Sequence, residues 1–144
     1  MEKQSFQVLP FEAVKEDWSL YRLRDKSIAK VRYILINVIK SIQLDVFGNP
    51  TFSFNYATVV GIIPEESLLG SPSPSISPEI LNASIVEKDI DFETMAEPWN
   101  EYRTEGKILR IKLVLTRIAR TNVFDEHGIP IYLVNTQPII KMEQ

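Results

Sequence analysis

The chain has no cysteine and only one histidine among its 144 residues. Without cysteine there can be no disulfide, catalytic thiol, iron–sulfur cluster or cysteine-ligated zinc, and one histidine excludes metal sites built from several histidines. Five glycines leave no place for a glycine-rich phosphate-binding loop. These absences exclude several large classes of enzyme and metalloprotein, and we expect no cofactor.

No stretch of the sequence is apolar for long enough to cross a membrane as a helix. The densest apolar run, residues 33–39, contains Asn37, and a membrane span needs about 20 residues. Residues 1–4 lead into no apolar segment, so we expect no secretory signal, no membrane and a cytoplasmic location. The formal net charge of −3 is close to neutral and favours no strongly charged partner by itself.

Two segments of the chain resemble each other. Residues 11–22 read FEAVKEDWSLYR and residues 92–103 read FETMAEPWNEYR, and six of the twelve positions agree, including the only two tryptophans. The agreeing pairs are Phe11/Phe92, Glu12/Glu93, Glu16/Glu97, Trp18/Trp99, Tyr21/Tyr102 and Arg22/Arg103. We therefore predict an internal duplication, with one repeat at 11–63, a second at 92–141 and a Pro/Ser-rich connector at 64–91.

Each repeat has the pattern of β-strands. In the second repeat Leu109, Ile111 and Leu113 are apolar at every second position while Arg110 and Lys112 alternate with them, which indicates a half-buried strand. This stretch, residues 108–121, corresponds to 28–42 in the first repeat at a spacing of 80. In both, the alternation changes phase near Asn37 and Arg117, which indicates a β-bulge.

Turn residues separate these strands. Glu105-Gly106 has the chemistry of a two-residue hairpin turn, because glycine accepts a positive φ. Longer turns of the form Asp-x-x-Gly-x-Pro occupy residues 45–50 and 125–130, and a third strand follows each. Each repeat is thus predicted to be a three-stranded meander, with a short extra strand before Trp18 as an option.

The predicted fold class is all-β, in one domain over residues 1–144. A meander of about 50 residues buries too little apolar surface to be stable alone. We therefore expect the two meanders to close on each other with pseudo-two-fold symmetry as one antiparallel barrel or sandwich, with strand edges covered by pairing between the repeats. The alternative is that the two meanders form two small units packed loosely side by side. In the connector, Ser77 is placed to cap a short helix over residues 77–82, with disorder as the alternative.

Four groups of side chains are candidates for chemistry, and each has a structural alternative that we favour. His127 in the second long turn has the type of an acid/base or metal ligand, but Phe47 stands in its place in the first repeat, which favours a solvated loop. The recurring acids beside Arg22 and Arg103 are able to divide acid and base roles, although ion pairs between strands are the commoner arrangement. These acids are Glu12, Glu16, Glu93 and Glu97.

The recurring aromatic residues and the basic residues are the other two groups. Trp18/Trp99 and Tyr21/Tyr102 have the composition of a stacking platform, but we expect them to be core anchors. Twelve of the sixteen basic residues fall at 21–40 and 101–120, among them the rows Lys30-x-Arg32 and Arg110-x-Lys112. These rows are candidates for tracking a nucleic-acid backbone with help from Lys40 and Arg120, although a solvated outer face is the commoner arrangement.

The sequence does not determine the function. We expect a non-enzymatic β-module that binds a protein partner or another copy of itself, because recurrence is confined to residues that build strands and turns. One alternative is nucleic-acid binding by the paired basic rows. Another is a small-ligand binder or enzyme with its site between the repeats, lined by Arg22 and Arg103 or by Glu16 and Glu97. The candidate binding residues are Lys30, Arg32, Arg110, Lys112, Arg22 and Arg103.

Overall fold

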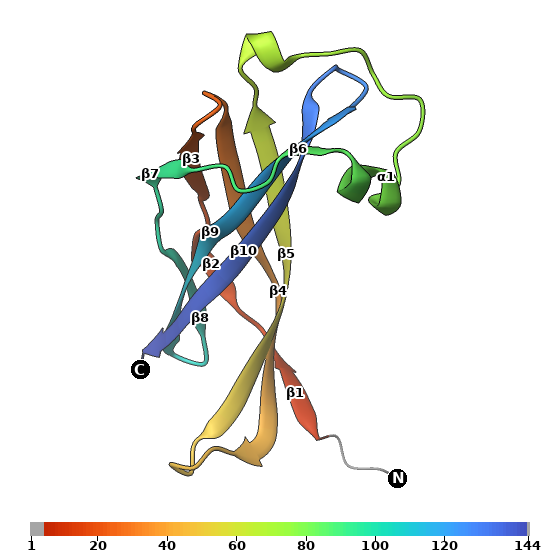
Figure 1. Cartoon of the computed structure of the whole chain (residues 1–144). Coiled ribbons are helices and arrows are strands. Elements are labelled where there is room, and N and C mark those ends of the chain that lie inside the picture. Colours follow the sequence, from red (N-terminus) through yellow and green to blue (C-terminus); the bar gives the residue numbers. More distant parts are fainter. Residues whose placement is uncertain (1–4, 144) are drawn as a thin grey trace.

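A computed structural model of the chain describes residues 5–143 as two antiparallel sheets of five strands each (Figure 1). The predicted all-β class is confirmed, with 65% of the described residues in strands. The first five strands are β1 (Phe6–Leu9), β2 (Glu12–Lys15), β3 (Trp18–Leu23), β4 (Ile28–Leu44) and β5 (Pro50–Ile63). The others are β6 (Ile85–Glu87), β7 (Phe92–Ala96), β8 (Asn100–Thr104), β9 (Lys107–Phe124) and β10 (Pro130–Glu143).

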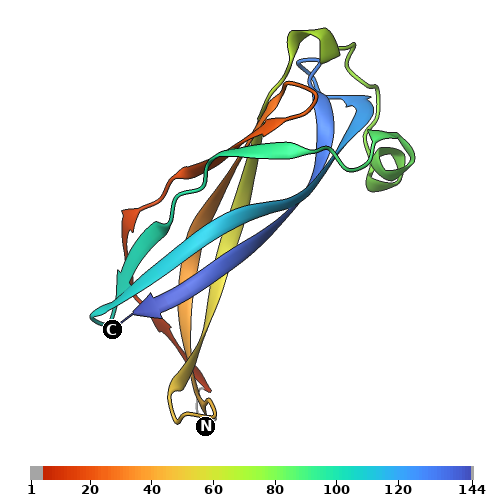
Figure 2. The ribbon, with the colours of Figure 1, turned by 60° about the vertical axis from the view of Figure 1, so that its left-hand side comes forward.

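The two sheets have matching strand orders. One runs β5–β4–β3–β7, with β1 paired to the far end of β4, and the other runs β10–β9–β8–β2, with β6 paired to the far end of β9. Each half of the chain therefore contributes one strand to the sheet of the other half: β2 pairs with β8, and β7 pairs with β3. Figure 2 shows the long hairpins β4–β5 and β9–β10 crossing each other.

The predicted bulges are present at corresponding positions. The β4–β5 register shifts between Leu35 and Asn37, leaving Ile36 as the extra residue. The β9–β10 register shifts in the same way between Leu115 and Arg117. The prediction of a bulge in both long strands is thus confirmed.

The turns between strands also have the conformations that their residues favour. Glu105 and Gly106 both have positive φ, 48° and 72°, and join β8 to β9 as the predicted two-residue hairpin turn. Lys26 has a φ of 74° in the corresponding β3–β4 turn, where no glycine is present. A lysine in this left-handed conformation is strained, because its Cβ approaches the backbone.

The connector contains the predicted short helix. The helix α1 (Pro78–Ala83) is capped by Ser77, whose Oγ accepts a hydrogen bond of 3.2 Å from the Ile80 N–H. It extends one residue beyond the predicted end, and a single 3₁₀ turn (Glu66–Leu68) precedes it. Order in this segment follows from the capping serine and from proline in the first turn.

A single core lies between the sheets and draws on both halves of the chain. Its largest fully buried side chains are Tyr21, Tyr33 and Tyr102, packed with aliphatic side chains of β4 and β9. The remaining core members from the two long strands are Ala29, Val31, Leu35, Val38, Leu109, Ile111, Leu113, Leu115 and Ile118. Shared packing of this kind couples the two halves.

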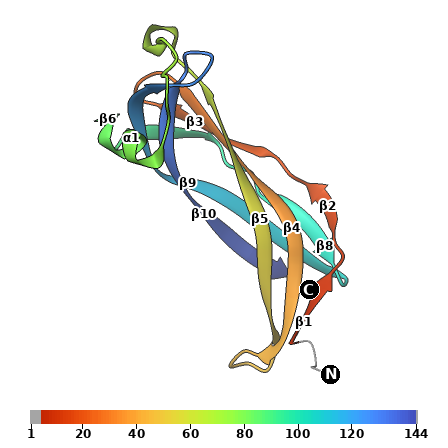
Figure 3. The same ribbon diagram turned by 90° about the vertical axis from the view of Figure 1, so that its right-hand side faces the viewer.

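The expectation of a fully covered sheet is wrong on one side. No closed sheet is present within residues 5–143, and no strand in that range pairs with the outer edge of β5 or of β10. The exchanged strands β2 and β7 cover the edges of β8 and β3 instead. Each half of the chain gives one strand to the other half's sheet, and within residues 5–143 no further strand is present to pair with the outer edge of β5 or β10. Figure 1 shows β7 at the left of the molecule, and Figure 3, which views the right-hand side of Figure 1, shows β5 and β10 toward the viewer.

Candidate functional site

The recurring glutamates hold core tyrosines across the two halves. Glu97 Oε2 accepts a hydrogen bond of 2.6 Å from the Tyr21 hydroxyl, and its Oε1 lies 3.0 Å from Lys112 Nζ. Glu16 Oε2 accepts a corresponding bond of 2.7 Å from the Tyr102 hydroxyl. Burial, reinforced by these carboxylates, raises the pKa of both tyrosines far above the ordinary value. The glutamates therefore act as structural links between strands.

A second pair of matching contacts joins turns to long strands. Asp25 is almost fully buried, accepts a 2.6 Å hydrogen bond from the Tyr132 hydroxyl and lies 3.2 Å from Arg120 Nη1. Lys40 Nζ and Glu105 Oε2 form the corresponding pair at 3.3 Å, more exposed to solvent. Lys40 and Arg120, predicted to assist nucleic-acid binding, thus each contact a carboxylate.

The arginines Arg22 and Arg103 do not converge on a cavity between the halves. Each is exposed and lies directly opposite an acid on an exchanged strand, with Arg22 facing Glu93 and Arg103 facing Glu12 in the register. The space between the sheets, where a shared site was an alternative, is filled by the buried tyrosines and aliphatic side chains.

The tryptophans were predicted to be core anchors, and this prediction is wrong. Trp18 and Trp99 lie half-buried on the outer faces of the sheets, where Lys30 Nζ sits 4.7 Å from the Trp18 ring centroid and Lys112 Nζ 5.5 Å from that of Trp99. Side chains three apart on a strand point to opposite faces, so burial of Tyr21 sends Trp18 outward. The tyrosine part of the prediction is confirmed.

The basic rows of β4 and β9 are largely neutralised by carboxylates. Arg110 Nη1 lies 2.7 Å from Glu143 Oε1, and Arg32 Nη2 lies 3.7 Å from Glu16 Oε1. With Lys112 held by Glu97, only Lys30 of the four lacks an ion pair within residues 5–143. A nucleic-acid backbone would have to displace these carboxylates, which removes much of the electrostatic gain of binding.

His127 lies in an exposed turn. Its backbone N–H donates a 2.8 Å hydrogen bond to Asp125 Oδ1, and its Nδ1 lies 3.9 Å from Glu126 Oε1. Within residues 5–143 no three acid or histidine side chains are grouped so as to hold a metal ion. The side chain belongs to a solvated turn.

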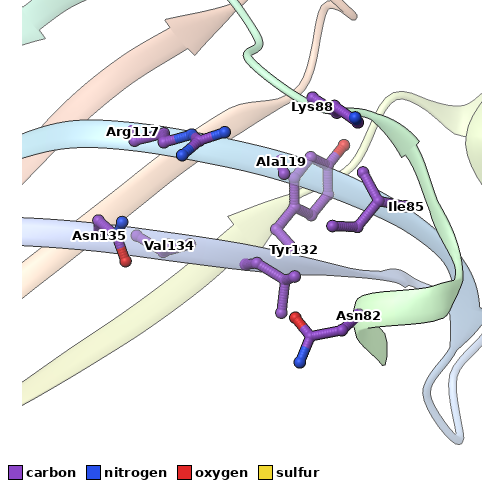
Figure 4. A pocket seen from close by; sticks show the side chains of 9 residues that line it. Asn82, Ile85, Lys88, Arg117, Ala119, Tyr132, Val134 and Asn135 are labelled. Carbon is purple, nitrogen blue, oxygen red and sulfur yellow. The ribbon is translucent and has the colours of Figure 1, made fainter. Parts of the chain in front are cut away.

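A cavity of about 580 Å³ lies between α1–β6 and the hairpin β9–β10 (Figure 4). Its polar lining comes from Lys88, Arg117, Tyr132 and the amides of Asn82 and Asn135. Arg117 is already engaged, with its Nε 2.6 Å from Asp89 Oδ1. The lining contains no acid or histidine to act as a base, and nothing in the sequence indicated these residues as a site.

The most unusual surface is the end of the β4–β5 hairpin, which extends beyond the rest of the molecule (Figures 1 and 3). We call residues 37–55, together with β1, the apolar arm. Four large hydrophobic side chains are exposed at its end, namely Ile42 (70% exposed), Leu44 (62%), Val46 (94%) and Phe47 (84%). An exposed apolar cluster with no packing role is typical of an interaction surface.

The other hairpin shows that the turn itself does not require apolar residues. The backbone N–H groups of Phe47 and His127 donate equal 2.8 Å hydrogen bonds to Asp45 and Asp125, so the two turns share one geometry. The residues at the tips differ: Val46-Phe47 in one hairpin and Glu126-His127 in the other. The apolar tip of the arm is therefore not explained by the turn.

The two hairpins also differ in what covers them. The connector lies over the β9–β10 end: the Gly70 N–H donates a hydrogen bond of 2.9 Å to the Gly128 carbonyl, and the Phe124 ring packs so close to Gly70 that a Cβ there would clash with it. Leu44 corresponds to Phe124 on the arm and is left exposed. The arm was not among the predicted sites, although a signal was available: residues 41–63 contain one charged side chain, Asp45.

Comparison of the chain with protein-family models, with curated proteins and with solved structures finds no match. Within residues 5–143, no helix has the length and apolar character needed to span a bilayer.

Proposed function

We propose that this chain is a non-enzymatic binding module, built from two copies of one β-unit, that holds a protein partner through its apolar arm. The observation that carries the proposal is the exposure of Val46 and Phe47, 94% and 84%, at the end of a projecting hairpin. Apolar side chains that stay in water lose the stabilisation that burial provides, about 25 cal/mol for each Å². A partner that covers them recovers it.

The chemistry of the arm favours a protein over a nucleic acid. Residues 37–55 and β1 carry one positive and one negative side chain, Lys40 and Asp45, and so no net charge. Nucleic-acid affinity depends on several cations that neutralise phosphates. A largely uncharged apolar surface instead fits the apolar centre of a protein interface.

Three observations support the duplication within the proposal. The two sheets have matching strand orders, the Glu16–Tyr102 and Glu97–Tyr21 contacts correspond, and both long strands are bulged at corresponding residues. Exchange of β2 and β7 between the halves supplies each sheet with its fourth strand. On this view the arm is the feature by which the first copy diverged from the second.

The test exchanges the tip of the arm for the tip of the other hairpin. The double variant Val46→Glu/Phe47→His keeps the turn geometry, since the corresponding turn carries these residues. We expect its urea unfolding midpoint to stay unchanged, because substitutions at such exposed positions rarely alter stability by more than about 0.5 kcal/mol.

The readout is the set of proteins cross-linked to a tagged chain in extracts of its source cells. The arm variant should lose partners that the wild-type chain and a control, His127→Ala, both retain. Identical partner sets for wild type and arm variant would contradict the proposal. Binding of the wild-type chain to lipid vesicles through the arm, or a catalytic turnover, would contradict it as well.

A further inference from the structure

The free edge of β5 is the second unexplained surface. The strand has 14 residues, and among residues 5–143 it pairs on one side only, with β4. Side chains on both of its faces are exposed, among them Tyr56, Val59, Val60 and Ile63. A long, apolar strand edge with unpaired N–H and C=O groups is a template for pairing with another strand, and proteins normally protect such edges.

The corresponding strand β10 is protected, whereas β5 is not. β10 contains Pro138, Lys141 and Glu143, while the 14 residues of β5 include no charged side chain and a proline only at Pro50, the first position. Proline and charged side chains on an edge strand are devices that prevent pairing between sheets. Exposed apolar side chains alone do not distinguish the two edges, since Val60 is 42% exposed and the corresponding Ile140 40%.

Pro138 also indicates which backbone groups of β5 are free. Proline fits into an edge strand where its nitrogen faces away from the neighbouring strand. Pro138 lies opposite Leu113, and Thr58 lies opposite Tyr33 at the corresponding place in the other sheet. The Thr58 N–H and C=O therefore point to the open edge, as do those of alternate residues on either side.

We propose that β5 pairs antiparallel with β5 of a second copy of this chain, which makes a two-fold dimer with a continuous sheet across the interface. The inference rests on the proposed function and names the partner of this part of the surface. Two features favour a second copy. A strand without charges opposes no like charges when it pairs with itself, and antiparallel pairing of identical strands satisfies the two-fold symmetry of a dimer. A two-fold axis near Ala57 pairs residues 51–63 of the two copies.

The size of this interface predicts a reversible dimer. A strand of 14 residues is roughly 45 Å long. A strip of that length and about 10 Å wide buries on the order of 900 Å² over both copies, which is below the usual range of about 1,200–2,000 Å² for stable complexes. We therefore expect a dissociation constant in the micromolar range, measurable by sedimentation velocity.

The experiment uses matched substitutions on the two edges of the full-length chain. Val60→Lys should weaken the dimer by about tenfold or more, because the ammonium group is desolvated or excluded at the new interface. Ile140→Lys, at the corresponding position of β10, should leave dimerisation within about twofold of the wild type. Thr58→Pro copies the native Pro138 onto β5 and should also give a monomer. Val60→Lys keeps the test valid if the proline variant does not fold.

A single cysteine locates the axis directly, since the wild-type chain has none. Ala57→Cys should form an intermolecular disulfide under mild oxidation, because directly opposite residues of paired strands lie within the Cα separation of about 4.4–6.8 Å that a disulfide needs. A matched Gln137→Cys on β10 should not.

Two results would overturn the inference. One is a wild-type chain that stays monomeric at the highest soluble concentration. The other is equal weakening of the dimer by Val60→Lys and Ile140→Lys. Neither result affects the proposed function, which the cross-linking assay with Val46→Glu/Phe47→His tests separately. That variant changes residues 46 and 47, which lie outside the proposed ladder.

Discussion

Replacement of Tyr21 by phenylalanine tests the contact that joins the two halves. The Tyr21 hydroxyl donates 2.6 Å to Glu97 and accepts 3.1 Å from the buried Leu115 N–H. A hydrogen bond to a charged group contributes about 1.5–3 kcal/mol, and a buried donor left without an acceptor costs about 1–3 kcal/mol. In the variant Glu97 keeps its ion pair with Lys112 and its partial contact with solvent. The loss of the Tyr21–Glu97 hydrogen bond should therefore cost an amount at the low end of the first range. We expect Tyr21→Phe to lower the free energy of unfolding by about 2–4 kcal/mol.

The matched control is Tyr33→Phe. Tyr33 is as deeply buried as Tyr21, but its hydroxyl has no hydrogen-bond partner among the described residues. Removal of an unpaired buried hydroxyl eliminates a desolvation cost, so this variant should be as stable as the wild type or more stable by up to about 1 kcal/mol. Urea unfolding followed by tryptophan fluorescence measures both. Equal losses for Tyr21→Phe and Tyr33→Phe would refute the reasoning.

Three further predictions concern stability. Asp25→Asn breaks a buried ion pair and should cost about 3 kcal/mol, whereas Glu105→Gln breaks the more exposed corresponding pair and should cost less than about 1 kcal/mol in the same urea assay. Lys26→Gly removes a lysine from the left-handed conformation and should therefore raise the free energy of unfolding by about 0.5–1 kcal/mol. A decrease in the free energy of unfolding would contradict the strain argument. Burial raises the pKa of Tyr132 to about 12, and it raises the pKa of Tyr21, Tyr33 and Tyr102 as well. The tyrosines of the unfolded chain therefore ionise first, and stability should fall above about pH 10, by up to about 1.4 kcal/mol per pH unit for each of these tyrosines. A flat profile in urea melts between about pH 9 and 11 would contradict this.

The local features of the fold were predictable because their causes are local. Alternation at Leu109, Ile111 and Leu113 depends only on the period of a strand, and Gly106 only on the φ of its turn. The bulges at Ile36 and Thr116 were predictable because a bulge in a half-buried strand shifts the alternation of apolar residues by one position, and this phase change is visible in the sequence. In each case a few neighbouring residues contain the whole signal.

The exchange of strands between the halves was not predictable from these signals. β2 and β7 are short and mostly exposed, so neither has an alternating pattern that identifies a partner. Pairing of β2 with β8 joins residues far apart in the sequence, and the register Glu12–Arg103 is set by the packing of both sheets together. The free edges of β5 and β10 are a consequence of the same exchange.

The interpretation of the recurring aromatic residues failed for a reason visible in the sequence. Trp18 and Tyr21 lie three apart on one strand and so cannot face the same side. Only one of them was able to enter the core. The exposed arm was likewise indicated by the scarcity of charge in residues 41–63, but whether an apolar strand is covered depends on the connector, which packs on the end of the β9–β10 hairpin rather than on the end of the β4–β5 hairpin.

The most direct test of the binding module places a photo-cross-linking phenylalanine analogue at the tip of each hairpin in turn. Residues 47 and 127 occupy the same place in turns of the same geometry, one apolar and one polar. The proposal predicts that irradiation joins the chain to a protein from position 47 and not from position 127. Equal cross-linking from both positions, or none from position 47, would contradict it.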